Sequence, residues 1–235
     1  MTKSIVYQHK PDPWSSHTLI AGWLRVLPPG SRVLDVGAAQ GTLAMLLQGQ
    51  GFVVRGIEPA ADWADLARPY YTDFCSTPLA EVDPAFLAGH AAVVCADVLE
   101  HLPDPQVELN RLVHLQLPGT WFILSVPNVA NLWVRLNLLL GRFDYSERGI
   151  LDRTHLRFFT RHSFLHMIAA AGLTVERVAV TPLPLNLVHP FFANHRLGRT
   201  VHAALAFATR ILPTLLGYQF VTLSTLKSES GENHG

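Results

Sequence analysis

The first residues that could do chemistry form a loop of small side chains just after an acid. An apolar run that contains Asp35 leads into Gly37-Ala38-Ala39-Gln40-Gly41, and a helical pattern starts at Thr42. Small side chains let a ligand approach the backbone closely, and the loop N–H groups can donate to it. Because an acid does not suit phosphate, the loop favours a ligand with an ammonium group or hydroxyls. A purely structural strand-to-helix turn fits the same pattern.

A second acid follows the loop by about 20 residues, at the end of the next apolar run. The segment is Gly56-Ile57-Glu58-Pro59. At that distance Glu58 can accept hydrogen bonds from both ribose hydroxyls of a nucleoside cofactor. The alternative is a glutamate that caps the following helix or faces solvent. The same acid occurs in nicotinamide-binding folds, so Glu58 alone does not identify the cofactor.

A third cluster of polar residues ends the apolar run 91–96. It comprises Asp97, Glu100 and His101, and the following text is Leu102-Pro103-Asp104-Pro105. Ligands of open α/β sheets bind at the carboxyl ends of the strands. Residues 97–101 should therefore face the bound ligands.

The elements that would position these residues alternate along the chain. Helices are predicted at 15–27, 42–50, 61–67, 161–171 and 196–212, and strands at 32–36, 52–57, 73–76, 91–96, 121–126, 174–180 and 218–226. Strands separated by helices predict a doubly wound, Rossmann-like parallel sheet. Runs such as 91–96 are apolar without alternation, as strands covered on both faces should be. Two long excursions interrupt the pattern, at 129–159 and 182–217.

Three stretches together resemble the class I S-adenosylmethionine (SAM) methyltransferases, in particular those labelled type 11, 12 or 23. They are the Asp35–Gly41 loop, the 95–105 segment, and the excursion text Ser125–Leu132, Leu140–Tyr145 and Ile150–Thr160. The resemblance runs from about Tyr7 to Leu226. In that family the loop usually carries a middle glycine, where this chain has Ala39.

The resemblance implies one methyltransferase domain over 1–228, with a disordered tail at 229–235. The implied sheet has seven strands with the last antiparallel, and 129–159 and 182–217 are helical insertions, the first a lid over the acceptor. The implied reaction is O-methylation of a small molecule, sugar or lipid-linked acceptor. The implied SAM-binding residues are Asp35, Gly37, Ala38, Ala39, Gly41, Glu58, Pro59, Asp97 and Val98.

The resemblance also bears on catalysis. Small-RNA 2′-O-methyltransferases and ubiquinone-biosynthesis O-methyltransferases carry a similar acid-x-x-acid-His text, which in the former holds a divalent metal with a later histidine. Here the metal candidates are Asp97, Glu100, His101 and, from the lid, His155. Glu100, His101 and His155 are the candidate catalytic residues. His155 could instead act as a plain general base, since histidine titrates near neutral pH, or be structural.

Composition limits the class of partner. Lysine plus arginine number 18, as do aspartate plus glutamate, which argues against bulk nucleic-acid binding. Cys75 and Cys95 lack metal-type spacing and suit a reducing, cytoplasmic compartment. In the predicted helix 196–212, apolar residues gather on one face and arginines on the other. The apolar face of this helix could pack on the sheet, form a homodimer contact, or lie on the inner face of a membrane.

Two other functions stay open on the sequence alone. A nucleotide-dependent oxidoreductase would share the loop and Glu58. A non-catalytic, methyltransferase-like partner subunit would share the fold, although the intact loop, Glu58 and Asp97 argue against it.

Overall fold

A seven-stranded mixed sheet forms the centre of the protein. The computed structural model describes residues 12–226, so the predicted tail 229–235 lies outside them. The strand order is β3-β2-β1-β4-β5-β7-β6, and β7 runs antiparallel to both neighbours. The predicted fold is therefore confirmed. The strands are β1 Arg32–Val36, β2 Val53–Ile57, β3 Asp73–Cys75, β4 Ala92–Ala96, β5 Trp121–Pro127, β6 Leu173–Thr181 and β7 Gln219–Leu226.

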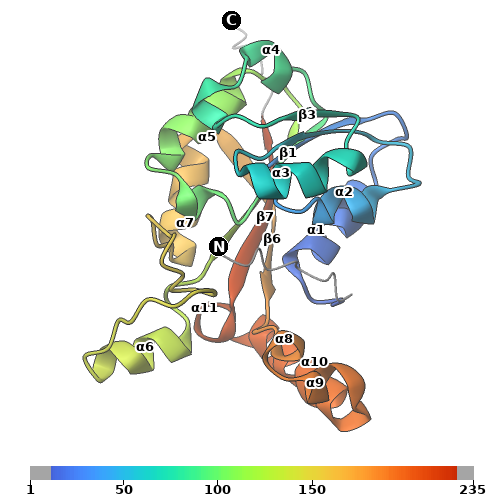
Figure 1. Ribbon diagram of the computed structural model, residues 1–235. Helices are drawn as coiled ribbons and strands as arrows, with labels where there is room; N and C mark the ends of the chain where they lie inside the picture. Colours follow the sequence, from blue (N-terminus) through green and yellow to red (C-terminus); the bar gives the residue numbers. More distant parts are fainter. Residues whose placement is uncertain (1–11, 227–235) are drawn as a thin grey trace, which may run out of the picture.

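Helices cover both faces of the sheet (Figure 1). They are α1 Ser16–Leu24, α2 Thr42–Leu47, α3 Ala61–Ala67, α4 Pro84–Leu87, α5 Pro105–His114, α6 Leu132–Leu139, α7 Arg161–Ala170, α8 Leu185–Val188, α9 Pro190–Asn194, α10 Arg196–Ile211 and α11 Pro213–Leu216. Three short 3-10 turns are η1 Arg68–Tyr70, η2 Leu79–Glu81 and η3 Leu99–His101. Helices α4 and α5 and the 3-10 turns were not predicted from the sequence, whereas α6, α8, α9 and α11 lie within the two insertions that were expected to be helical.

Alternate strand residues feed two separate cores, one on each face. Leu34 and Phe122 pack with α5 and α7, while Val33 and Ile123 pack with α1 and α2. Successive strand side chains point to opposite faces, so a strand buried on both sides must be apolar at every position. This explains why the runs that predicted strands showed no alternation.

Both insertions begin at the same end of the sheet, where the parallel strands have their carboxyl ends. One follows β5 and the other follows β6, and these two strands point the same way because each is antiparallel to β7. Figure 1 shows α6 and the α8–α10 group projecting from that end of the sheet as two arms, with α11 between their bases. Asn128 and Asn131, at the base of the first arm, donate through their side-chain amides to the Gly217 carbonyl in the second, at 2.9 and 2.8 Å.

Helix α10 is present as predicted, but its apolar face does not pack on the sheet. The buried residues are small or polar: Gly198, His202, Ala206 and Thr209. Leu197, Phe207 and Ile211 are exposed instead. A Cβ on Gly198 would lie 2.2 Å from the Phe191 carbonyl oxygen, so glycine is what lets α9 and α10 approach. No helix among residues 12–226 is long and apolar enough to cross a bilayer.

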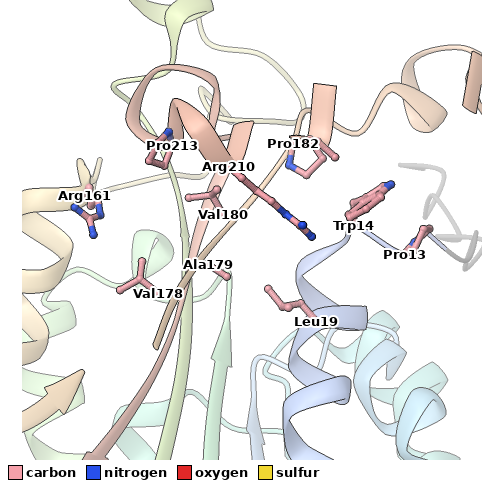
Figure 2. Close-up of a pocket in the computed structure, with 11 residues that line it drawn as sticks. Pro13, Trp14, Leu19, Arg161, Val178, Ala179, Val180, Pro182, Arg210 and Pro213 are labelled. Atoms are coloured by element: carbon pink, nitrogen blue, oxygen red, sulfur yellow. The ribbon is translucent and has the colours of Figure 1, made fainter. Parts of the chain in front are cut away.

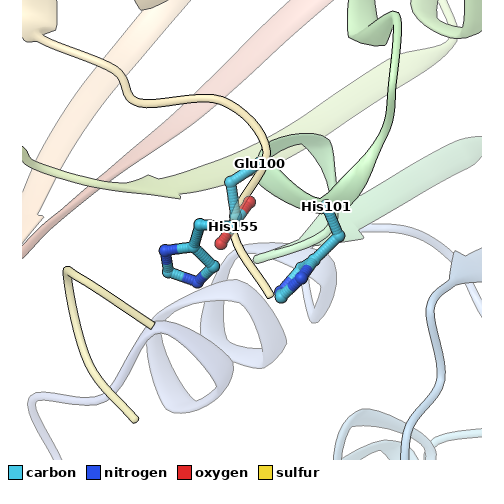
Figure 3. Close-up of side chains that lie close together, drawn as sticks. All are labelled: Glu100, His101 and His155. Carbon is cyan, nitrogen blue, oxygen red and sulfur yellow. The ribbon is translucent and has the colours of Figure 1, made fainter. Parts of the chain in front are cut away.

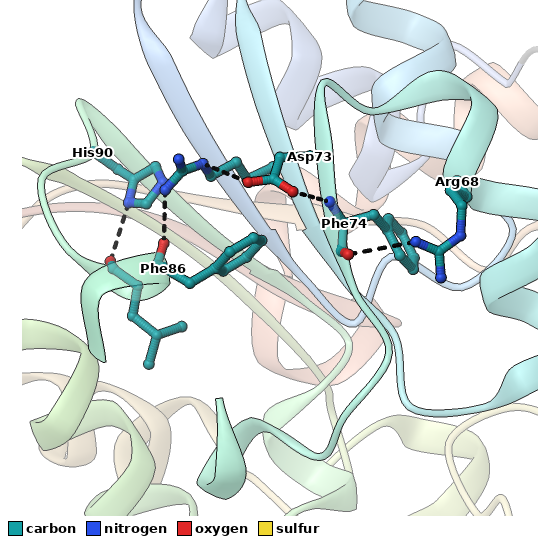
Figure 4. Close-up of polar contacts among 7 residues, drawn as sticks. Arg68, Asp73, Phe74, Phe86 and His90 are labelled. Atoms are coloured by element: carbon teal, nitrogen blue, oxygen red, sulfur yellow. Dashed lines mark hydrogen bonds and ion pairs between the residues drawn. The ribbon is translucent and has the colours of Figure 1, made fainter. Parts of the chain in front are cut away.

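A polar network ties β2 and β3 to the α4 turn (Figure 4). Arg55 pairs with Asp73 at 3.6 Å and donates to the Phe86 carbonyl at 3.3 Å. Nearby, His90 Nδ1 bonds the Leu87 carbonyl at 3.0 Å. Burial lowers the pKa of His90 to about 4, which keeps the ring neutral. The network fixes the strands at the end of the sheet opposite the arms.

The loop after β1 contains a left-handed residue that is not glycine. Ala39 has a φ of 44°, between Gly37 at 73° and Gly41 at 82°. This is the position at which the family usually has glycine. A Cβ in the left-handed region costs about 1–2 kcal/mol, so the loop carries strain that the surrounding contacts must offset.

We predict that Ala39→Gly stabilises the protein. Relief of the left-handed strain, less the extra backbone entropy of glycine, should raise the free energy of unfolding by about 0.5–1 kcal/mol. The comparison variant is Ala38→Gly: the φ of Ala38 is not positive, so glycine there relieves no strain, adds backbone entropy and removes a buried methyl group. Urea denaturation would measure both. A loss of stability in Ala39→Gly equal to that in Ala38→Gly would contradict the prediction.

Candidate functional site

A cavity of about 740 Å³ lies at the carboxyl ends of the parallel strands, where both insertions contribute to its wall. Its wall includes the ends of β1, β2 and β4, the start of α1, and residues of both insertions. This volume is within the usual range for small-molecule and cofactor sites. Of the residues predicted to bind a cofactor, the wall contains Gly37, Ala39, Glu58, Pro59, Asp97 and Val98. Asp35, Ala38 and Gly41 lie outside the wall.

Glu58 links the loop to helix α3. Its carboxylate accepts from the Ala39 N–H at 2.8 Å and from the Ala60 N–H at 2.9 Å. Ala60 immediately precedes α3, so Glu58 fixes the entry to this helix without bonding an N–H of its first turn. Two bonds leave further acceptor capacity on the two oxygens, so this role and hydroxyl binding are compatible. Glu58 therefore faces the cavity in a fixed orientation.

The loop N–H groups differ from the sequence expectation, because neighbouring backbone and Glu58 already occupy them. Gly37 and Ala38 donate to the Ile57 carbonyl, at 2.8 and 2.9 Å, and Gly41 donates to Ala38. A Cβ on Gly37 would lie 2.4 Å from Val98 Cγ2, so glycine is required for β1 and the residue after β4 to approach. The loop glycines therefore serve close packing within the protein, of Val98 on Gly37 and of Ala67 on Gly41.

Asp35 lies behind the cavity rather than in it. Its Oδ2 accepts from the Tyr71 hydroxyl at 2.5 Å, and the residue is 3% exposed. Burial raises the pKa of Asp35 to about 7, and the Glu58 carboxylate adds to this rise while the Tyr71 bond opposes it. An acid with this pKa responds strongly to any positive charge placed nearby.

Asp97 is held from two neighbouring strands, at the position where β4 ends. Ser125 of β5 donates to its Oδ1 at 2.8 Å, and Gln219 of β7 donates to its Oδ2 at 2.5 Å. Its φ of 58° is left-handed, a conformation that aspartate tolerates better than most residues. Burial raises the pKa of Asp97, an effect that nearby His17 opposes.

Glu100, His101 and His155 converge, as Figure 3 shows. One ligand atom from each lies within 4.8 Å of the others, whereas Asp97 is not a member of this group. His155 Nδ1 bonds the Ile150 carbonyl at 3.0 Å, and His101 Nδ1 bonds the Thr154 carbonyl at 3.2 Å. A carbonyl only accepts, so each Nδ1 is the donor and a neutral ring keeps its Nε2 lone pair.

Both carboxylate oxygens of Glu100 are buried and make no hydrogen bond with the described residues. Burial raises the pKa of Glu100 well above its ordinary value, and the Asp97 carboxylate adds to the rise. Burial also lowers the pKa of His155. Meanwhile the Glu100 carbonyl accepts from the N–H groups of Leu156 and Arg157, at 2.8 and 3.0 Å, and so fixes the returning end of the first insertion.

Several wall residues were not predicted from the sequence. They include His17, Trp63, Arg148, Tyr218 and Gln219. A signal existed for the last two. Because β7 is antiparallel, it begins at the edge where the parallel strands end, so the residues at its start must face the ligand region. His17 carries no such signal, since it lies in the first turn of a helix far away in sequence.

A second cavity of about 390 Å³ adjoins the first and shares Trp14 and Pro182 with it (Figure 2). It lies beside β6, and its wall includes Arg161 and Arg210. The Arg210 guanidinium lies 5.4 Å from the Trp14 ring centroid. Arg210 therefore turns toward α1 and away from the exposed face of α10.

Known proteins are similar over most of the chain. A family model described as "Methyltransferase domain" matches residues 14–178. A ubiquinone biosynthesis O-methyltransferase of Burkholderia thailandensis is 30% identical over 169 residues, 67% of this chain and 71% of that protein. The solved magnesium protoporphyrin IX methyltransferase of Synechocystis PCC 6803, with bound SAH, superposes with a TM-score of 0.60 at 16% identity. The match covers 91% of this chain and 82% of that one.

The cyclase SpnF has the same fold, with a TM-score of 0.58 at 15% identity over 93% of this chain and 85% of its own. Fold alone therefore does not fix the reaction. The family match does exclude the nicotinamide oxidoreductase considered above. The chain belongs to the methyltransferase domain family and is a SAM-dependent methyltransferase.

Proposed function

We propose that this protein methylates a hydroxyl of a small-molecule, sugar or lipid-linked acceptor, with Glu100, His101 and His155 acting on that hydroxyl. The proposal rests mainly on one observation: these three side chains converge in the same cavity wall that contains Glu58 and residues of the loop after β1. Bound SAM supplies a methyl group on a positively charged sulfur. The protein must bind both molecules in line and handle the hydroxyl proton.

The cofactor side of the cavity fits SAM. Gly37 and Ala39 lie in the cavity wall, and Glu58 beside them keeps acceptor capacity for ribose hydroxyls. Asp35 and Asp97 are carboxyl groups with raised pKa values close to the loop, where a cationic ligand would favour their charged forms. Asp97 then lies between the cofactor and acceptor sides.

The acceptor side offers two ways to handle the proton. The neutral His155 ring, with Nδ1 held by Ile150, keeps Nε2 free to accept a proton from a hydroxyl. Alternatively, Glu100, His101 and His155 would hold a divalent cation, which lowers the pKa of a bound hydroxyl. The unpartnered, buried Glu100 carboxylate supports the second arrangement, because buried polar groups normally have a partner.

We also propose that 129–159 is a lid. It supplies Arg148, Asp152 and His155 to the wall, so its position sets the shape of the acceptor side. Its outer helix, α6, buries only Val134, whereas at the base of the segment the Val129 N–H donates to the Phe159 carbonyl at 2.9 Å.

A cytoplasmic location is supported by the free thiols of Cys75 and Cys95. Homodimerisation stays a further proposal.

We predict that Glu58→Ala weakens SAM binding by about 1–3 kcal/mol, because ribose hydroxyls lose a charged acceptor. Glu58→Gln, which keeps one carbonyl acceptor, should lose less. Glu81→Ala removes an exposed acid outside the cavity and serves as the control. Calorimetry would measure affinity, and thermal melting would show whether the loop stays folded. Unchanged affinity in a folded Glu58→Ala protein would disprove this role.

We predict that His155→Ala lowers the rate of methyl transfer by about 10²- to 10⁴-fold, the usual contribution of a general base. SAM affinity should be unchanged. His166→Ala, an exposed histidine on α7, should keep full activity. A chelator separates the two arrangements: it stops turnover but not SAM binding if the cluster holds a cation, and has no effect if His155 acts alone. Near-normal turnover in His155→Ala would reject both.

We predict that the product cofactor SAH together with an acceptor slows hydrogen exchange in 129–159, because a closed lid protects its amides. Protection should be largest around 144–155, next to the cavity. The helix α5, which is outside the cavity, is the internal reference. Unchanged exchange in 129–159 under saturating ligands would leave the segment as a structural insertion only.

A further inference from the structure

More than half of the large apolar side chains that are exposed in residues 12–226 lie on the two arms. We call these residues the docking surface. On the first arm they are Trp133, Leu136, Leu138, Leu139 and Leu140, and on the second Leu183, Leu187, Val188, Phe191, Leu197, Val201, Phe207, Ile211 and Leu212. Isolated exposed apolar residues are normal, but a concentration of this kind marks an interaction site.

The charged side chains within the docking surface have one sign. Residues 132–140 and 183–212 contain arginine but no aspartate, glutamate or lysine, and the acids nearest in sequence to the first of these stretches, Asp144 and Glu147, follow it. Arg135 and Arg142 belong to the first arm, and Arg196 and Arg199 to the second. A basic surface with exposed apolar groups is complementary to an anionic lipid bilayer, where apolar side chains enter the headgroup boundary and arginines meet the lipid phosphates.

The exposure of the second arm follows from its packing. Helix α10 contacts its neighbours through Gly198, His202 and Thr209, and close contact with α9 requires the missing Cβ of Gly198. Rotating α10 to bury Leu197 and Ile211 would break that contact. The apolar face therefore points outward because the opposite face is fitted to α9.

The docking surface borders the cavity. Both arms leave the carboxyl edge of the sheet, and α8 contributes Asn186 and Leu187 to the cavity wall. Leu187 is 59% exposed, so the apolar surface continues from the outside into the wall. An acceptor dissolved in a bilayer could pass along α8 to the cavity without crossing water.

A second copy of the chain suits this surface less well. A two-fold dimer brings the same patch against itself, and residues 132–140 and 183–212 contain no acid with which the arginines of the other copy could pair. Lipid phosphates provide the missing negative charge.

We infer that α6 and the α8–α10 group dock together on an anionic phospholipid bilayer, with the cavity mouth between them facing the lipid and the acceptor drawn from it. The route of the acceptor rests on the proposed function, whereas docking itself does not. Because the docking surface is divided between two arms, we expect each arm to contribute to bilayer binding and neither to suffice alone.

Flotation with vesicles tests the docking. The wild-type protein should float with phosphatidylglycerol-containing vesicles and remain behind with pure phosphatidylcholine. Leu139→Glu on α6 and Phe207→Glu on α10 should each lower partitioning by about tenfold or more, and the double variant should abolish it. Arg142→Ala and Arg196→Ala should each cost about fivefold, the contribution of one arginine near an anionic surface.

The matched controls are Leu117→Glu and Val26→Glu, whose side chains are comparably exposed, at 69% and 77%, but lie off the arms. They should float like wild type. SAM calorimetry on every variant shows that it is folded and tests the cofactor site separately. Absence of wild-type flotation, or equal flotation of Leu139→Glu and Leu117→Glu, would overturn the inference. So would light scattering that shows a dimer dissociated by Leu139→Glu.

Discussion

The antiparallel insertion of β7 between β5 and β6 is the constraint on which the site depends. It makes β5 and β6 parallel to each other, so the two insertions leave the same edge. It also places the start of β7 at that edge, where Gln219 donates to Asp97. If β7 were simply added outside β6, Gln219 could not reach Asp97, and the arms would no longer share their amide bonds at Gly217.

The sequence predicted the strands whose side chains are all buried. Strands buried on both sides have to be apolar throughout, and the loop–Glu58 distance follows from one strand–helix–strand unit, so both could be predicted. The convergence of Glu100, His101 and His155 was also expected, because all three were assigned to one sheet edge and its lid. Asp97 lies in the same cavity wall, close enough for its carboxylate to raise the pKa of Glu100. It is also bonded to Ser125 and Gln219, which the sequence did not predict.

Other features could not be predicted because the periodicity of a segment does not indicate which other segment packs against it. The pattern of α10 predicts an apolar and an arginine face, yet the face that packs is a third one, with His202 and Thr209, and Gly198 fits it to α9. Likewise, Asp35 has the position of a cofactor ligand in sequence, yet Tyr71, which is 36 residues away, bonds it behind the cavity. Contacts between distant segments decide such cases, and one sequence does not contain them.

The bond between Asp97 and Gln219 spans 122 residues, which has a consequence for synthesis on the ribosome. Chains emerge from the N-terminus first, so β1 to β5 can pair before β7 exists. Until β7 forms, β5 presents an open edge and β6 has no strand to join. An unpaired edge is a template for aggregation. The nascent protein therefore passes through a stage in which five of the seven strands are paired, the outer side of β5 is unprotected, and the methyl-transfer site cannot yet exist.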